Sequence, residues 1–414
     1  MDRTEKLSQN SRLYNLRVVS FTIMSANRKI KTYSISLKNS QFSILLIVLM
    51  SACVDRIDFD TGITTSFPIV IEGGISDQLG PYKVRISKAY DIESKYSIKT
   101  PIDVSNVSIS DGHGTIENLT RSDAGEYSSS IDGIRGVIGE AYSVRVELRD
   151  GRIYESIPDT LYEAGSIDSV YYNFIETKGV DDVSNYGFDL FFNSTSGNRK
   201  DYYFLWKFTG TFRADTNPEL GNPLRDGCQR YNGKCNWLPI CTGLLNVASP
   251  DYPPSFERIA PCTCCRCWYN IYNEKLLLSD SYLTRLGRFT GVKLATVPLN
   301  GWIFQDKLRV EISQLSLSRD AFLFWKSIKD QKDAVNSLFQ PVTGKIVSNF
   351  KQLTGATSPV YGFFYSSSQS AKSLFISKQD VPNVNLIPAI PVSTESCLSL
   401  FPNSTTERPL FWID

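Results

Sequence analysis

Short segments in which apolar and polar residues alternate recur along most of this chain, and turn-forming residues separate them. The segment 82–90 (YKVRISKAY) places Val84 and Ile86 on one face, and a Gly80-Pro81 turn joins it to the preceding segment FPIVIEGGIS. Because the side chains of a β-strand point alternately to its two faces, this spacing predicts half-buried strands. The chain also contains 21 Tyr and 23 Phe, and aromatic side chains favour pleated strands. A mainly β fold is therefore expected.

The strand-like segments fall into two groups. Those of the first group are separated by Asp-Gly turns, and several short strands separated by turns are typical of a β-sandwich. We therefore expect an N-terminal β-sandwich over residues 67–158, followed by a second β-rich unit over residues 159–414. The segments are 104–110, 141–148 and 152–157 in the first unit, and 171–175, 186–192, 201–208, 344–350, 361–367 and 373–377 in the second.

One helix is predicted in the second unit. Ser318 stands in the position of an N-cap, and Phe322, Trp325 and Ile328 follow at helical spacing. The fold class expected is thus mainly β, with one or two helices and a cysteine-rich loop.

An apolar run near the N-terminus resembles the core of a signal peptide. Residues 42–50 (FSILLIVLM) are too few to span a bilayer as a helix, which needs about 20 apolar residues. Four basic residues and no acidic residue lie in the stretch that leads to the run, as export signals require. Ser51 and Ala52 then precede Cys53, and this ending resembles a bacterial lipobox, in which the cysteine is acylated and becomes the new N-terminus. We therefore expect lipidation of Cys53, with a cleaved signal and a free Cys53 as the alternative.

The start of the chain is harder to reconcile with such a signal. A signal that begins at Met1 would be far longer than the usual length of about 15 to 30 residues, whereas one that begins at Met24 has a normal length. We interpret residues 1–23 as a misassigned start, residues 24–52 as the signal peptide and residues 53–66 as a linker. Acidic residues soon after Cys53 resemble the surface-export signals of Bacteroidetes lipoproteins.

The remaining cysteines form one dense cluster. With Cys53 set aside, eight of the nine cysteines remain, and an even number suits disulfides. Seven lie within residues 214–267, which are rich in Pro, Gly and Asn and are expected to form a long cross-linked loop. The disulfide candidates are Cys228, Cys235, Cys241, Cys262, Cys264, Cys265, Cys267 and Cys397.

A metal site is the alternative interpretation of this cluster, because CTCCRC (262–267) offers four thiolates. Zinc sites usually use pairs of the form C-x₂₋₄-C, however, and the adjacent Cys264 and Cys265 point in different directions in most backbones. An exported chain also meets an oxidising compartment, where disulfides persist. We expect disulfides of undetermined pairing, no metal and no cofactor, with free thiols as a third alternative.

Charge and motifs argue against several functional classes. The net charge is +1, so no broad field attracts nucleic acid. The single histidine, His113, lies in a DGHG turn, which disfavours catalysis by histidine and multi-histidine metal sites. The chain contains no dinucleotide-binding, Walker, G-x-S-x-G or H-E-x-x-H motif. Aromatic runs at 202–208 and 361–365 are interpreted mainly as core, with stacking platforms for sugars or peptides as the alternative.

Several segments resemble one known family. The segment 69–90 (IVIEGGISDQLGPYKVRISKAY), following a lipobox-like cysteine, looks like the opening of the domain of unknown function 4249 family of Bacteroidetes lipoproteins. Segments 308–328, 340–350 and 361–368 and the closing Cys397 also resemble it. The resemblance implies an outer-membrane lipoprotein, often encoded beside TonB-dependent receptors, and it supplies no catalytic residues.

These observations favour a non-enzymatic envelope lipoprotein, lipid-anchored in the outer membrane. It would capture a ligand for a TonB-dependent transporter or serve as an accessory partner of that transporter. A hydrolase acting on peptide or glycan and a structural or adhesive surface protein are the alternatives.

Lipidation can be tested by replacing Cys53. Cys53→Ala removes the thiol that would carry the lipid, so the protein should move from the membrane to the soluble fraction. Radiolabelled palmitate should label the wild type and not the variant. Equal labelling of the two would show that the lipid is not on Cys53.

Overall fold

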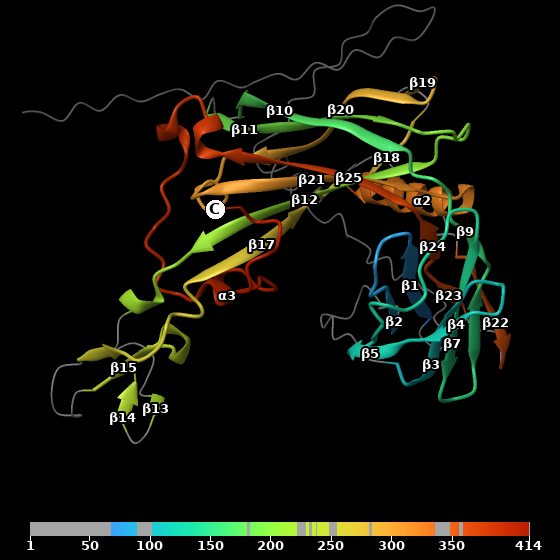
Figure 1. Cartoon of the computed structure of the whole chain (residues 1–414), viewed down its shortest axis with the longest axis horizontal. Coiled ribbons are helices and arrows are strands. Elements are labelled where there is room, and N and C mark those ends of the chain that lie inside the picture. Colours follow the sequence, from blue (N-terminus) through green and yellow to red (C-terminus); the bar gives the residue numbers. More distant parts are fainter. Residues whose placement is uncertain are drawn as a thin grey trace, which may run out of the picture. The chain divides into compact units, whose positions relative to one another are not determined.

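The computed structural model describes ten segments of the chain, and strands dominate them (Figure 1). All ten belong to the compact unit Ile63–Asp414. The segments are residues 68–88, 102–179, 183–221, 229–231, 234–236, 238–247, 255–280, 284–335, 348–355 and 359–413.

Two six-stranded sheets enclose the first hydrophobic core. One sheet has the order β23 (Val360–Tyr361), β1 (Ile69–Ser76), β2 (Lys83–Lys88), β6 (Glu126–Ser128) and β5 (Thr120–Asp123), with β24 (Phe364–Ser367) also paired to β1. The other has the order β22 (Phe350–Thr354), β8 (Ile153–Ser156), β7 (Ala141–Leu148), β3 (Val104–Ser110) and β4 (Ile116–Asn118), with β9 (Asp159–Thr160) paired to β7. We call this part the first sandwich.

The alternation seen in the sequence sets which face of each strand is buried. In β1 the side chains of Ile69, Ile71 and Ile75 are at most 2% exposed, and in β2 those of Val84 and Ile86 are buried as well. These residues pack in one core with apolar residues of β3, β7 and β8. The two strands predicted on either side of the Gly80-Pro81 turn therefore form, and they pair antiparallel as far as residue 88, where the description of this segment ends.

Strands from the C-terminal part of the chain complete the first sandwich. β23 and β24 pair with β1 in parallel, and β22 pairs with β8 in antiparallel orientation. Phe350 and Phe364 enter the first core from these strands. The sequence pattern placed the end of the sandwich at residue 158, because periodicity locates strands but does not say which strands pair across a long separation.

A second sandwich encloses the larger aromatic core (Figure 1). One of its sheets has the order β10 (Ser166–Lys178), β11 (Ser184–Thr195), β20 (Arg288–Pro298) and β19 (Thr284–Arg285). The other has the order β17 (Arg266–Tyr272), β12 (Phe204–Asp215), β21 (Lys307–Ser316) and β25 (Gln369–Ser377), with β18 (Leu277–Leu278) paired to β12. Both sheets are antiparallel, and rings from β11, β12 and β20 meet between them, with Trp206 4.9 Å from Phe289 between ring centroids.

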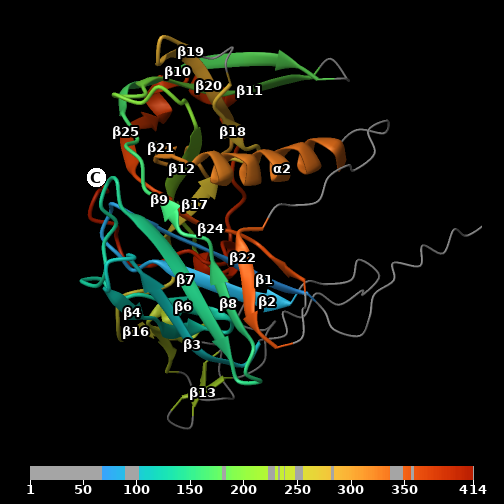
Figure 2. The same cartoon turned by 90° about the vertical axis from the view of Figure 1, so that its right-hand side faces the viewer.

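Helix α2 (Arg319–Val335) lies between the second sandwich and the strands of the first (Figure 2). The predicted cap is confirmed, because the Ser318 hydroxyl accepts a hydrogen bond from the Ala321 backbone N–H at 3.1 Å. Phe324 and Ala321 pack in one hydrophobic cluster with Leu205 of β12 and with Phe363, the residue before β24. The helix thus uses one apolar face to join the two sandwiches.

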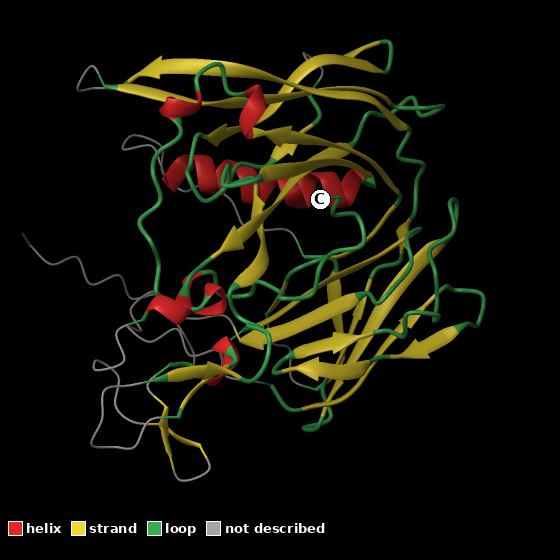
Figure 3. Cartoon of the chain, turned by 60° about the vertical axis from the view of Figure 1, so that its left-hand side comes forward, coloured by secondary structure: helices red, strands yellow, loops and turns green. Residues whose placement is uncertain are grey.

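The cysteine-rich region contains short regular elements (Figure 3). β12 continues to Asp215 and β17 begins at Arg266, so both ends of the predicted loop 214–267 belong to strands. Between them lie η1 (Pro218–Leu220), β13 (Gln229–Tyr231), β14 (Lys234–Asn236), η2 (Ile240–Thr242), β15 (Leu244–Asn246) and β16 (Phe256–Arg258). Strands of three residues are too short to show a period, which is why the sequence predicted a loop. The remaining elements are η3 (Lys378–Asp380), η4 (Val384–Leu386) and α3 (Cys397–Leu400).

A buried amide ties three parts of the second sandwich together. Gln314 in β21 has no exposed surface. Its side-chain oxygen accepts a hydrogen bond from Trp206 Nε1 at 2.7 Å, and its Nε2 donates to the carbonyl oxygens of Thr195, at 2.9 Å, and Ala164. Every polar atom of this side chain is therefore used, as a buried amide requires.

Replacing Gln314 by leucine should destabilise the protein. The substitution leaves the Trp206 N–H and two carbonyls without this partner in a dry interior, which costs about 2 to 4 kcal/mol of unfolding free energy. Urea denaturation measures the effect. Gln379→Leu, at an exposed position of η3, is the control and should change stability by less than about 0.5 kcal/mol. A Gln314→Leu midpoint equal to that of the wild type would contradict the role assigned to this amide.

Candidate functional site

A cavity of about 520 Å³ lies where α2 faces the first sandwich. Its lining comes from the outer face of β1 and β2, from β24 and the residues beside it, from one face of α2, and from single residues of β12 and β21. This volume suits a small organic ligand, since ligand cavities are typically about 300 to 1,000 Å³. The cavity is the candidate binding site.

Strand alternation explains which residues reach the cavity. In β12, Phe204, Trp206 and Phe208 enter the large aromatic core. Lys207 therefore points to the opposite face of the sheet, where it lines the cavity. Most of the aromatic run 202–208 is thus part of the core, as predicted. Lys207, the one basic residue of the run, lines the cavity instead.

The close approach of β24 to β1 depends on glycine. A Cβ atom on Gly74 would lie 2.7 Å from the backbone oxygen of Tyr365, a distance that real Cβ atoms essentially never show. The absence of a side chain lets the two parallel strands pair and lets the Tyr365 ring lie over the glycine. Tyr365 then forms part of the cavity lining.

Aromatic rings form one wall of the cavity. Trp325 of α2 meets Tyr365 edge to face, with ring centroids 5.9 Å apart, and meets Phe324 in the same way at 5.5 Å. Lys207 Nζ lies 5.8 Å from the centre of the Trp325 ring, within the range of a cation–π contact. This wall therefore offers an aromatic surface with a cation beside it, and the aromatic run 361–365 contributes to it through Tyr365.

Positive charge also lies on the sheet side of the cavity. Lys83 and Arg85 in β2 both pair with Glu126, at 2.6 Å and 2.9 Å. Hydrogen bonds from Lys83 and Arg85 lower the pKa of Glu126 to about 2, so this carboxylate stays ionised at neutral pH. Both cations line the cavity, as does the exposed carboxylate of Glu72, whereas Glu126 does not. The lining thus presents three cationic side chains and one anionic side chain.

A buried carboxylate positions α2 beside the cavity. Asp159 in β9 is 6% exposed and accepts a hydrogen bond from the Ser366 backbone N–H at 2.8 Å. It also accepts a hydrogen bond from Ser318, the residue that caps α2. Burial raises the pKa of Asp159 to about 6, and the two hydrogen bonds oppose this shift. One carboxylate therefore links β9, β24 and the start of α2.

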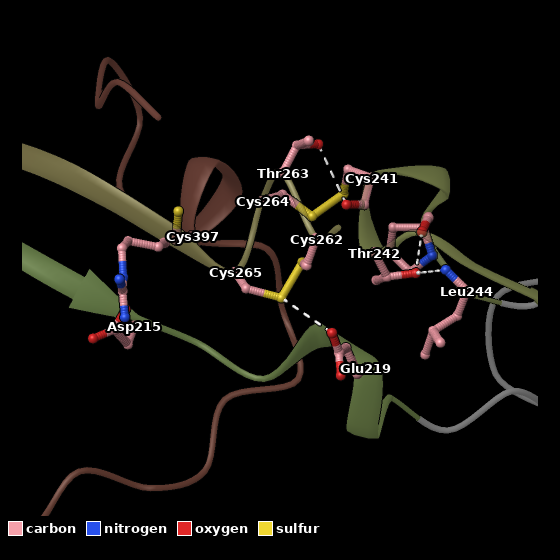
Figure 4. Close-up of a disulfide and its surroundings, with 12 residues drawn as sticks. Asp215, Glu219, Cys241, Thr242, Leu244, Cys262, Thr263, Cys264, Cys265 and Cys397 are labelled. Carbon is pink, nitrogen blue, oxygen red and sulfur yellow. Dashed lines mark hydrogen bonds and ion pairs between the residues drawn. A yellow bond between two sulfur atoms is a disulfide. The ribbon is translucent and has the colours of Figure 1, made fainter. Parts of the chain in front are cut away.

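Among the described residues, three disulfides connect six of the candidate cysteines, as Figure 4 shows for two of these bonds. The pairs are Cys241–Cys264, Cys262–Cys265 and Cys267–Cys397. The adjacent Cys264 and Cys265 take different partners, which agrees with the expectation that neighbouring side chains point in different directions. Cys53, Cys228 and the side chain of Cys235 lie outside the described residues.

Glu219 lies beside one of these disulfides. The sulfur atoms of Cys262 and Cys265 and a carboxylate oxygen of Glu219 all lie within 4.8 Å of one another (Figure 4). In this structure the two sulfurs are bonded to each other. Nothing in the sequence around Glu219 marked it, because it is brought to the cysteines from η1 by folding.

His113 lies in an exposed turn, as predicted. Its Nε2 contacts the carboxylate of Glu140, which is also partly exposed. Among the described residues, no helix is long and apolar enough to cross a membrane.

Fold and cavity together define a protein of two β-sandwiches with a ligand-sized cavity beside the helix that joins them. The chain belongs to the family described as "Domain of unknown function (DUF4249)", whose model matches residues 55–373. The resemblance seen in the sequence is thereby confirmed at the level of the family. None of the curated proteins matches the chain.

The raised pKa of Asp159 predicts a pH-dependent effect of Asp159→Asn. In the folded protein the carboxyl group binds its proton more tightly than in the unfolded chain, so its contribution to stability falls as pH rises from about 4 to about 6. Above that range the ionised group costs about 2 to 3 kcal/mol. Asparagine keeps an acceptor for Ser366 and carries no charge.

The variant should therefore be more stable than the wild type at pH 7.5, and the difference should shrink towards pH 4. Denaturant titrations at both pH values measure it, with Asp132→Asn at an exposed position as the control. A difference that is independent of pH would show that Asp159 titrates as it does in the unfolded chain.

Proposed function

We propose that this protein is an exported envelope lipoprotein, anchored through Cys53 in the outer membrane, that binds a small ligand in the cavity beside α2. It acts as a ligand-capture partner of a TonB-dependent transporter. The cavity carries the binding part of this proposal, because its volume and its mixture of aromatic and charged lining are typical of ligand sites. The membrane location and the transporter rest on the lipobox-like ending at Cys53 and on the family resemblance.

An enzyme is less well supported. A hydrolase that uses two carboxylates needs them close together in a cleft, with pKa values driven apart. Among the residues that the structure describes, Asp159 is the one carboxyl group with a raised pKa, and it does not line the cavity. Its two hydrogen-bond partners give it a structural role at the start of α2. A structural or adhesive surface protein is the other alternative, and no observation in the described part of the chain favours it.

A charge reversal in the cavity can distinguish ligand binding by this protein from its association with the transporter. Lys207→Glu replaces the cation beside Trp325 by an anion, which should weaken the binding of an anionic or polar ligand by about tenfold or more. Cells carrying this variant should take up one nutrient as poorly as the deletion strain. The transporter should still be inserted and should still crosslink to the variant.

Lys351→Glu, at an exposed position of β22, is the matched control and should support normal uptake. Normal uptake with Lys207→Glu, alongside impaired uptake in the deletion strain, would mean that the protein assists the transporter without using this cavity. Crosslinking of the wild type that recovers no transporter, together with unchanged uptake in the deletion strain, would exclude the partnership.

A further inference from the structure

One disulfide differs from the other two in its accessibility. Both sulfur-bearing residues of the Cys262–Cys265 pair are partly exposed. Cys267 and Cys397 are fully buried, and in the third pair Cys241 is partly exposed whereas Cys264 is only 1% exposed. Thiol–disulfide exchange requires a thiolate to reach a sulfur atom in line with the bond, so an accessible pair reacts first. Cys262–Cys265 is the one described pair in which both cysteines are partly exposed, so a reductant can approach either of its sulfur atoms.

The same disulfide constrains the chain least. The two cysteines of the Cys262–Cys265 pair are 3 positions apart in the sequence. The sequence separation is 23 for Cys241–Cys264 and 130 for Cys267–Cys397. A disulfide stabilises a fold mainly by closing a loop in the unfolded chain, and the effect grows with loop length. Reduction of the disulfide that closes the shortest loop thus leaves the two disulfides that close longer loops in place. The surrounding fold should survive the loss of this bond.

Glu219 is held beside this pair by other contacts. Its Oε1 accepts a hydrogen bond from Arg258 Nη2 at 2.7 Å and lies 3.7 Å from Cys265 Sγ. Arg258 belongs to β16, which pairs with β15, and Glu219 belongs to η1. The carboxylate is therefore fixed by an ion pair that does not involve the cysteines, and it keeps its position when the disulfide opens.

The reduced pair would present a set of metal ligands. Two cysteines separated by two residues have the spacing of a zinc ligand pair, and carboxylate oxygen is a third common zinc ligand. The three ligand atoms already lie within 4.8 Å of one another. Three protein ligands leave the fourth position of a tetrahedral site to water.

We propose that Cys262–Cys265 is a reducible disulfide and that its dithiol form, together with Glu219, binds Zn²⁺ or a similar thiophilic divalent cation. An external dithiol supplies the two electrons: one of its thiolates attacks a sulfur of the pair, a mixed disulfide forms, and its second thiol displaces the protein thiolate. The reductant leaves as a disulfide and the protein holds two thiols. Binding of the cation then releases the two thiol protons. This site lies apart from the cavity lining and does not depend on the proposed function.

The first test measures the order of reduction and the binding of Zn²⁺ by the purified full chain. Limiting dithiothreitol under anaerobic conditions, followed by alkylation and peptide mapping, should label Cys262 and Cys265 before the cysteines of the other two pairs. After removal of the reductant the protein should bind about one more Zn²⁺ per chain than the oxidised protein, with release of about two protons. Earlier labelling of Cys241 and Cys264 would overturn the proposed order.

Two variants separate this site from other thiols. Cys262→Ser/Cys265→Ser keeps both longer disulfides and should lose the added Zn²⁺. Glu219→Gln keeps every cysteine and should weaken Zn²⁺ binding by at least about tenfold. Loss of a residue that only hydrogen-bonds to a metal ligand already lowers metal affinity by about this factor. Glu257→Gln, at an exposed position of β16, is the control and should bind Zn²⁺ as the wild type does. Unchanged binding in either site variant, or no gain of Zn²⁺ on reduction of the wild type, would refute the proposal.

Discussion

The parallel pairing of β24 with β1 is the contact on which the rest of the arrangement depends. It runs from Gly73 opposite Phe364 to Ser76 opposite Ser367, and it is extended by a hydrogen bond from the Gln369 backbone N–H to Asp77 across 292 positions of sequence. The pairing places β24 beside both the first sandwich and α2. Without it, Tyr365 would not lie beside Trp325 of α2, and the aromatic wall of the cavity would not form.

The two sandwiches differ in how their cores are built. Branched aliphatic side chains dominate the first core, whereas aromatic rings fill much of the second, where Phe192, Trp206 and Phe289 pack against one another. Large rings leave room for few polar atoms, and a polar atom among them is costly to bury unless it is hydrogen-bonded. Gln314 meets this requirement for Trp206, and it also fixes the segment that leads from the first sandwich into the second.

The sequence predicted local structure well and long-range structure poorly. Alternation over residues 82–88 and helical spacing after Ser318 are local signals, and both elements form as expected. The pairing of β22 with β8 and the disulfide between Cys267 and Cys397 join distant residues, and no local pattern specifies them. The roles of Lys207 and Glu219 in the candidate sites were missed for the same reason, because both residues acquire their neighbours only when separate elements come together. Even the cysteine count, which indicated disulfides, left the partners open.

The composite first sandwich has a consequence for how the chain can be made. Synthesis proceeds from the N-terminus, so the strands up to β8, which ends at Ser156, are complete long before β22 begins at Phe350. During that interval β1 lacks its parallel neighbours and β8 lacks β22, and unpaired strand edges are prone to associate with other chains. The N-terminal strands of the first sandwich therefore cannot complete their pairing until β22 and β24, which lie in about the last sixth of the polypeptide, have been made. The second sandwich is likewise incomplete until β25 has been made, because β25 follows β24.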